Sequence, residues 1–142
     1  MNKRILHSAI GLLSRREHSA KEITQKLLLR KFDLDEIPPV IEFLIEQNYL
    51  SHDRFAESIF RTRVNRGYGW LFIENELNKK GVSSSIIMQL KNNQQIDWYL
   101  QAELAYNKRF GTAAIIDQKD KAKRVRFLQS RGFTTDEIFS IL

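Results

Sequence analysis

Apolar residues recur at helical spacing along almost the whole chain. One apolar stripe runs through residues 5–13 and another through residues 55–64, with apolar positions three or four residues apart. This spacing places apolar side chains on one face of an α-helix. No segment alternates apolar and polar residues strictly enough to predict a β-strand. The pattern therefore predicts an all-α fold.

Helix boundaries are marked by specific residue types. Ser19–Glu22 and Thr134–Glu137 have the form of a capping box, in which a hydroxyl and a carboxylate accept hydrogen bonds from backbone N–H groups. Residues 33–36 have the same form, but the two prolines that follow leave the start of that helix open. A glycine after a basic residue is a typical helix stop. Such stops occur at Gly67, Gly81 and Gly132, and Gly69 is expected in the turn after the first of them.

These signals recur with a period of roughly 50 residues. Residues 77–83 resemble residues 128–134 and also align with residues 27–33. Each copy reads as a helix, a tight turn with one apolar residue, a capping side chain and a second helix. The apolar stripes at residues 55–64 and 98–110 supply a third helix per repeat. Because a small helical unit cannot bury its apolar face alone, we expect tandem three-helix, helix-turn-helix-like repeats that form an elongated, curved array.

The chain of 142 residues has room for three such repeats. We expect the first at residues 1–50, beginning with an N-terminal helix at residues 3–16. We expect the second at residues 51–98 and the third at residues 99–142. An array of this kind has no single deep core, so its function depends on its surface.

Composition narrows the possible functions. The chain contains no cysteine, which excludes disulfides, thiolate metal sites and cysteine nucleophiles. Its apolar N-terminal positions are interrupted by polar residues, unlike those of a secretory leader. No run approaches the roughly 18 apolar residues that a membrane span needs. We therefore expect a cytoplasmic protein without a membrane partner.

Residues suited to catalysis are scattered. His7, His18 and His52 have no second ligand at metal-binding spacing on one helix face. Residues 67–69, Gly-Tyr-Gly, resemble half of a dinucleotide-binding fingerprint, but no strand precedes them and the third glycine is missing. We interpret this segment as a helix stop and a turn. The sequence thus predicts no catalytic residue, no metal site and no cofactor.

Positive charge is the main functional signal. The chain carries 23 Lys and Arg residues against 17 Asp and Glu residues, a net charge of +6, and the excess gathers toward the C-terminal third. Charge alone is equally consistent with solvated helix faces and with a surface that binds nucleic acid or an acidic protein. The sequence leaves open whether Tyr68 and Trp70 are core residues or stack on bases. The candidate contact residues are Arg54, Arg61, Arg63, Arg66, Lys79, Lys80, Lys108, Arg109, Lys121, Lys123, Arg124 and Arg126.

Residues 74–90 also have the helix, glycine turn and second helix of a helix-turn-helix DNA-binding motif. The second helix presents mainly serine, glutamine and asparagine, and its counterparts begin with acidic pairs at residues 35–36 and 136–137. Because negative charge opposes binding to a phosphate backbone, base readout by these helices is disfavoured. A helix-turn-helix regulator and a helical scaffold that binds an acidic protein are the alternative functions.

The most specific motifs lie in residues 47–87. This region resembles the signature of the RecX regulatory proteins, which are bacterial modulators of the RecA recombinase. The resemblance rests on Tyr49–Glu57, Arg61–Arg63, Arg66–Gly69, Ile73–Leu77 and Lys80–Val82, and residues 123–138 resemble the terminal repeat of the family. Two positions depart from the pattern and concern the geometry of turns. Gln47-Asn48 stand where a glycine usually precedes the Tyr-Leu pair, and Trp70 stands where proline is common.

The resemblance implies tandem three-helix repeats, in agreement with the period. It also implies a non-enzymatic protein that binds along the groove of the RecA–single-stranded-DNA filament. Such a protein inhibits the ATPase, recombinase and strand-exchange activities of RecA in DNA repair and the SOS response. We expect the signature arginines to face the filament with help from the other candidate contact residues, weak direct binding to DNA, and a monomeric chain. The residues that match the signature are Arg54, Arg61, Arg63, Arg66, Gly67 and Gly69.

Overall fold

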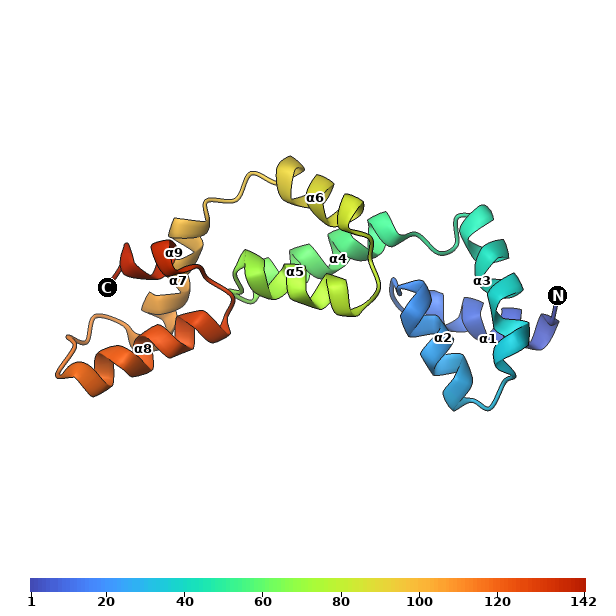
Figure 1. The fold of residues 1–142 in the computed structure, drawn as a ribbon, viewed down its shortest axis with the longest axis horizontal. Coiled ribbons are helices and arrows are strands. Elements are labelled where there is room, and N and C mark those ends of the chain that lie inside the picture. Colours follow the sequence, from blue (N-terminus) through green and yellow to red (C-terminus); the bar gives the residue numbers. More distant parts are fainter. The chain divides into compact units, whose positions relative to one another are not determined.

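The structure is a computed structural model that describes all residues, 1–142. It contains nine α-helices, one 3-10 helix and no strand (Figure 1), so the predicted all-α class is confirmed. The elements are α1 (Lys3–Leu13), α2 (Ala20–Leu29), η1 (Leu34–Glu36), α3 (Ile37–Glu46), α4 (His52–Asn65), α5 (Trp70–Lys79), α6 (Ser84–Asn93), α7 (Trp98–Phe110), α8 (Gln118–Ser130) and α9 (Thr135–Phe139).

Both predicted capping boxes are confirmed. At the start of α2, the Glu22 backbone N–H donates to the Ser19 hydroxyl (3.1 Å), and the Ser19 N–H donates to the Glu22 carboxylate (3.2 Å). Thr134 and Glu137 make the same two bonds at the start of α9, at 3.2 and 2.8 Å. These local bonds satisfy N–H groups that have no partner within the helix.

The third segment with this form does not act as a capping box. Asp33 makes no side-chain cap hydrogen bond, and the residues after it form the short 3-10 helix η1. Helix α3 begins only at Ile37, with Pro38 and Pro39 in its first turn. Proline fits there because it lacks an N–H that the first turn would leave without a partner.

The N-terminal helix is shorter than predicted. It ends at Leu13 instead of residue 16. The Ser14 hydroxyl donates to the Gly11 carbonyl (2.7 Å), and the Arg15 N–H donates to the Leu12 carbonyl (3.2 Å). Hydrogen bonds that span three residues tighten a last turn and end it.

The turn after the second helix of each repeat closes in the same way. The N–H of the apolar turn residue donates to a carbonyl five residues earlier, as in a Schellman motif. The residue before it has a positive φ, which a glycine supplies in the second and third repeats and Lys31 (φ 67°) supplies in the first. The hydrogen bonds are Phe32 to Leu27 (3.3 Å), Val82 to Leu77 (3.0 Å) and Phe133 to Leu128 (3.2 Å).

The turn before α4 contains one of the two residues other than glycine that have a positive φ. Asn48 has a φ of 61°, in the left-handed region that favours glycine. Among residues with a side chain, asparagine tolerates this region best. The asparagine therefore takes the left-handed conformation that a glycine would adopt readily at this position.

The chain forms two compact units. We call residues 1–58 with 77–88 the N-terminal unit, and residues 59–76 with 89–142 the C-terminal unit. Helices α1, α2 and α3 pack against one another in the N-terminal unit, and helices α7, α8 and α9 do so in the C-terminal unit. The first core consists of Ile5, Ala9, Leu12, Ile23, Leu27, Ile37, Val40, Leu44 and Leu50. The second consists of Ala102, Leu128, Phe133 and Ile138.

Two properties of the helices bear on function. None of the helices has both the length and the apolar character needed to cross a membrane. No three histidine, aspartate or glutamate side chains are grouped so that they could hold a metal ion.

Candidate anion-binding surface

The candidate contact residues divide into those that have a partner inside the chain and those that do not. Arg54, in the first turn of α4, belongs to the first group. Its guanidinium donates to the Glu17 carboxylate (3.1 Å), to the Asn48 side chain (3.0 Å) and to the Asn48 carbonyl (2.8 Å). These bonds tie α4 to the turn before it and to the α1–α2 connection. Arg54 therefore stabilises the N-terminal unit.

Arg63, near the end of α4, is held by α5. Its guanidinium makes two short hydrogen bonds to the Glu76 carboxylate, at 2.7 and 2.8 Å. It also lies 5.8 Å from the centre of the Tyr68 ring and 5.8 Å from that of the Phe72 ring. The hydrogen bonds to Glu76 raise the pKa of Arg63 above its ordinary value. A bidentate, partly buried pair of this kind fixes the orientation of α5 against α4.

Lys80 contacts a carboxylate that is almost fully buried. Glu22 on α2 accepts hydrogen bonds from Lys80 Nζ (2.7 Å) and from the guanidinium of Arg16 (3.0 and 3.2 Å). Burial by itself would raise the pKa of Glu22, but the hydrogen bonds from Arg16, Lys80 and the Ser19 backbone lower it to about 2. Glu22 is thus an anion at neutral pH, and Lys80 is one of its two cationic partners.

Arg124 on α8 lies inside the C-terminal unit, with 4% of its surface exposed. Its guanidinium donates to the Tyr106 hydroxyl (2.7 Å), to the Ala113 carbonyl (2.8 Å), to the Ala114 carbonyl (3.2 Å) and to the Asp120 carboxylate (3.1 Å). These bonds use most of its donors, so Arg124 has no free face for an external partner.

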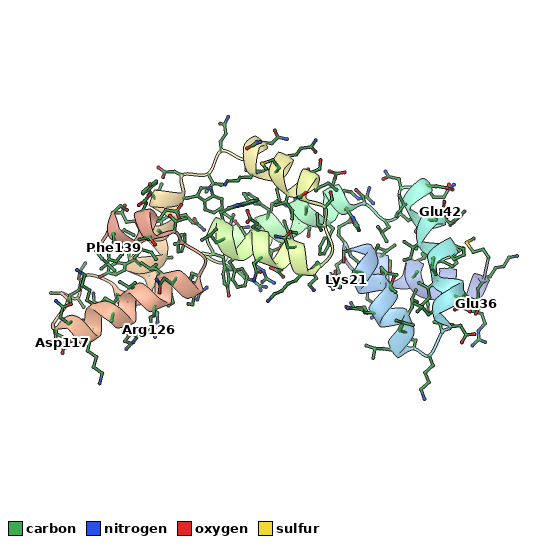
Figure 2. All side chains as sticks on the ribbon, in the orientation of Figure 1. Lys21, Glu36, Glu42, Asp117, Arg126 and Phe139 are labelled. Carbon is green, nitrogen blue, oxygen red and sulfur yellow. The ribbon has the colours of Figure 1, made fainter.

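Four of the candidates thus have structural roles and are not part of the proposed contact surface. They are Arg54, Arg63, Lys80 and Arg124. The remaining ones form no ion pair and are exposed, except Lys121, which is partly buried. Arg126, for example, projects from the side of α8 that faces away from α9 (Figure 2). The remaining candidates are Arg61, Arg66, Lys79, Lys108, Arg109, Lys121, Lys123 and Arg126.

Three of these residues meet around one hollow of the C-terminal unit. Its volume is about 230 Å³. Cations come from the turn after α4, from the last turns of α7 and from the end of α8, and the rest of the lining is small or aromatic. We call this hollow the cationic pocket. It is lined by Arg66, Gly67, Ala105, Lys108, Arg109, Phe127 and Arg131.

Arg131 is the pocket cation that sequence reasoning missed. Its guanidinium lies 4.6 Å from the centre of the Tyr68 ring and 5.1 Å from that of Phe127, and it donates to the Arg66 carbonyl (3.4 Å). In the sequence, Arg131 stands out only as the basic residue of a helix stop. Lys80 has the same place before Gly81 and is among the candidates, so consistent treatment of the repeat would have found Arg131.

Two tight turns bring the pocket residues together. The Gly69 N–H donates to the Arg131 carbonyl (2.7 Å), and the Leu71 N–H donates to the Gly132 carbonyl (3.1 Å). A side chain at Gly69 would collide with the Gly132 carbonyl, and one at Gly132 would collide with the backbone of Phe72. Only glycines allow this approach, because they have no Cβ.

The structure also places the two aromatic residues that the sequence left open. Trp70 is 5% exposed and packs against Phe60 and Trp98, with ring centres 6.4 and 6.2 Å away, so it is a core residue. Tyr68 is half-buried: its ring lies 4.2 Å from that of Phe72 and beside the Arg131 guanidinium. Tyr68 therefore supports the pocket.

The cationic pocket is suited to an anion. None of its four cations forms an ion pair within the chain. Arginine and lysine bind phosphate through charge-assisted hydrogen bonds, and like charges held close together repel until an anion neutralises them. Phe127 and Ala105 add an apolar wall that a bare inorganic ion would not use. The lining matches a phosphate group that carries an organic substituent.

The tandem helical repeats place the chain in the helical-repeat class. Models of the RecX family match the chain in three places: the first three-helix domain at residues 6–44, the second at residues 51–89 and the third at residues 97–142. The chain therefore belongs to the RecX family of non-enzymatic regulatory proteins.

Individual relatives agree with this assignment. The regulatory protein RecX of Vibrio parahaemolyticus is 43% identical over 131 residues, which cover 92% of this chain and 84% of the relative. That of Halorhodospira halophila is 39% identical over 131 residues, which cover 92% of this chain and 81% of the relative. The crystal structure of RecX from Lactobacillus salivarius superposes with a TM-score of 0.76 at 24% identity, over 98% of this chain and 92% of that one, and supports the fold.

Proposed function

We propose that this chain binds the filament that RecA forms on single-stranded DNA in the cytoplasm and inhibits its ATPase, recombinase and strand-exchange activities. It would thereby modulate DNA repair and the SOS response. Membership of the RecX family supports a regulatory role. The observation that supports contact with a nucleic-acid-bearing partner is the cationic pocket, whose cations have no carboxylate partner within the chain.

In this proposal, the pocket receives a phosphate of the DNA backbone, and the other cations add weaker contacts to the filament. Phosphate contacts fix position without reading sequence, which suits a protein that must act on a filament formed on any DNA. The supporting cations are Arg61, Lys79 and Arg126, and Lys121 and Lys123 in the first turns of α8 contact the protein part of the filament.

Inhibition of this kind needs no chemistry by the regulator. A ligand shifts a conformational equilibrium by the difference between its affinities for the two states. A protein that prefers a filament state with slow ATP hydrolysis therefore lowers the ATPase activity by binding alone. If the chain contacted two neighbouring RecA protomers at once, it would have such a preference wherever the two filament states place those protomers differently.

The test is a titration of the chain into RecA on single-stranded DNA, with ATP hydrolysis followed at two salt concentrations. The variant with Arg66→Ala, Lys108→Ala and Arg109→Ala should inhibit at least tenfold less well than the wild type. For single strands the salt slope changes by about 0.7 for each phosphate that the protein no longer neutralises. The variant should therefore show a shallower slope.

The control variant removes the same charge elsewhere. Lys3, Arg4 and Arg15 are exposed basic residues of the N-terminal unit that form no ion pair. Their triple replacement by alanine should leave inhibition close to the wild-type level. Equal inhibition by the pocket variant and the wild type would contradict the assignment of the pocket. Tight binding to duplex DNA without RecA would favour the helix-turn-helix alternative instead.

A further inference from the structure

The connection between α7 and α8 carries a continuous apolar segment on the surface. Residues 113–116, Ala-Ala-Ile-Ile, are all exposed. Ile115 is 38% exposed and Ile116 is 83% exposed. Single exposed apolar residues are common, but consecutive aliphatic residues on a loop mark an interaction site. We call residues 113–116 the apolar loop.

The apolar loop is held in place by α8. Arg124, almost fully buried, donates to the carbonyls of Ala113 (2.8 Å) and Ala114 (3.2 Å). The Asp120 carboxylate accepts from the backbone N–H of Ile116 (3.2 Å) and pairs with Arg124 (3.1 Å). A buried arginine is costly unless all its donors are satisfied. Here its donors fix the backbone of a surface loop.

A loop fixed in this way loses little conformational freedom when it binds. Pre-ordered binding segments gain affinity because the entropy cost of ordering falls on folding instead of binding. A fixed loop that exposes isoleucine to water has no benefit for the isolated chain, since the apolar area stays hydrated. The arrangement is therefore that of an anchor for a partner.

The chemistry of the loop favours a protein surface over nucleic acid. Its side chains are aliphatic, with no aromatic ring to stack on a base and no donor or acceptor to read one. They gain free energy only by burial in an apolar socket. The next turns of α8 carry Lys119, Lys121 and Lys123. These lysines favour a socket bordered by carboxylates.

We propose that the apolar loop inserts Ile115 and Ile116 into an apolar, carboxylate-bordered socket on a protein partner. The identity of the partner rests on the proposed function, under which it is a RecA protomer of the filament. The chain would then use separate parts of its C-terminal unit for two tasks: the cationic pocket for phosphate and the apolar loop for protein.

The first experiment compares Ile116→Ser with Leu29→Ser. Leu29, at the end of α2, is also 83% exposed, so the two substitutions remove similar surface. Binding to RecA filaments on labelled single-stranded DNA and to the bare DNA is measured by fluorescence anisotropy. Ile116→Ser should weaken filament binding tenfold to roughly a hundredfold, the range for one buried side chain. Its binding to bare DNA should not change, and Leu29→Ser should bind both as the wild type does.

Each other outcome overturns a specific claim. Wild-type affinity of Ile116→Ser for the filament would overturn the loop proposal and leave the proposed function standing. An equal loss of affinity for filament and bare DNA would mean that the loop contacts DNA, which also overturns it. If the wild type itself does not bind the filament, the proposed function fails and the assignment of this partner fails with it.

The second experiment tests Arg124 as a positioning residue. Arg124→Met removes the hydrogen bonds to the loop and leaves an apolar side chain in the buried site. Hydrogen exchange of the loop amides should become faster. Filament binding should weaken at least fivefold in the wild-type background and less than twofold in the Ile116→Ser background, because the anchor is already absent there. Equal losses of filament affinity in both backgrounds would show that Arg124 supports the fold only. If Arg124→Met does not fold, Ile116→Ser still tests the loop.

Discussion

In the N-terminal unit, Arg16 and Lys80 surround the buried carboxylate of Glu22. In the C-terminal unit, four cations surround a hollow whose lining includes no carboxylate. Both groups lie at helix ends and in turns, and each draws its residues from two repeats. The difference lies in the counter-charge: the N-terminal group is neutralised by a carboxylate of the chain, whereas the lining of the C-terminal group includes none. The comparison explains why charge density alone does not identify a binding surface.

The largest effect is expected when the pocket is given its own carboxylate. Ala105 on α7 lines the pocket, so Ala105→Glu would place an anion among Arg66, Lys108, Arg109 and Arg131. The C-terminal group would then resemble the Glu22 group. Filament binding should fall by at least a hundredfold, since the new carboxylate both occupies the pocket and repels phosphate. Because Ala105 also packs against the core of the C-terminal unit, urea denaturation checks that the variant is folded.

Leu104→Glu is the matched control for this substitution. Leu104 precedes Ala105 on α7, is 57% exposed and does not line the pocket. Leu104→Glu adds the same charge to the same helix as Ala105→Glu, so a general charge effect on filament binding would appear in both variants. An equal loss in the two variants would remove the distinction between the pocket and the rest of α7.

The second effect concerns stability and the N-terminal group. Glu22→Gln leaves two cations without their carboxylate, and we expect a loss of about 2 kcal/mol, moderated because Arg16 and Lys80 are partly exposed to water. Filament binding by the folded variant should not change. Urea denaturation at pH 7 measures the loss, with Glu42→Gln on the exposed side of α3 as the control (Figure 2).

The pH dependence of this variant separates charge from packing. The pKa of Glu22 is about 2 in the folded chain against an ordinary value of 4.5, so the unfolded chain binds the proton more tightly. The contribution of Glu22 is therefore complete above pH 4.5 and is lost as the pH falls toward 2. Glu22→Gln should lack this part of the acid sensitivity. If both proteins lose stability in parallel below pH 4.5, the ion pairs at Glu22 do not carry the effect.

The parts of the structure that the sequence predicted are those encoded by neighbouring residues. The two capping boxes, the repeated helix stop and the all-α class depend on spacings of a few residues. Which cations form ion pairs does not depend on such short spacings. Lys80 pairs with Glu22 from 58 residues away, and Arg63 pairs with a glutamate on the next helix. Only the packed structure shows which basic residues meet a carboxylate. Arg131 itself has a local signal, its place before Gly132, but the pocket around it has none, because most of the lining residues come from other parts of the chain.

The smallest effect tests how the two units build the same turn. Lys31 and Gly132 have equivalent places after the second helix of their repeats, both with positive φ (67° and 93°). A side chain in this region is strained, so Lys31→Gly should raise the free energy of unfolding by about 0.5–1 kcal/mol. This net gain is the strain energy that glycine relieves, minus the entropy cost of the more flexible unfolded chain. Gly132→Ala should cost more than this gain, because its Cβ would also collide with the backbone of Phe72. Urea denaturation of both variants measures the two changes. A Lys31→Gly variant less stable than the wild type would mean that lysine makes contacts at this turn that outweigh its strain.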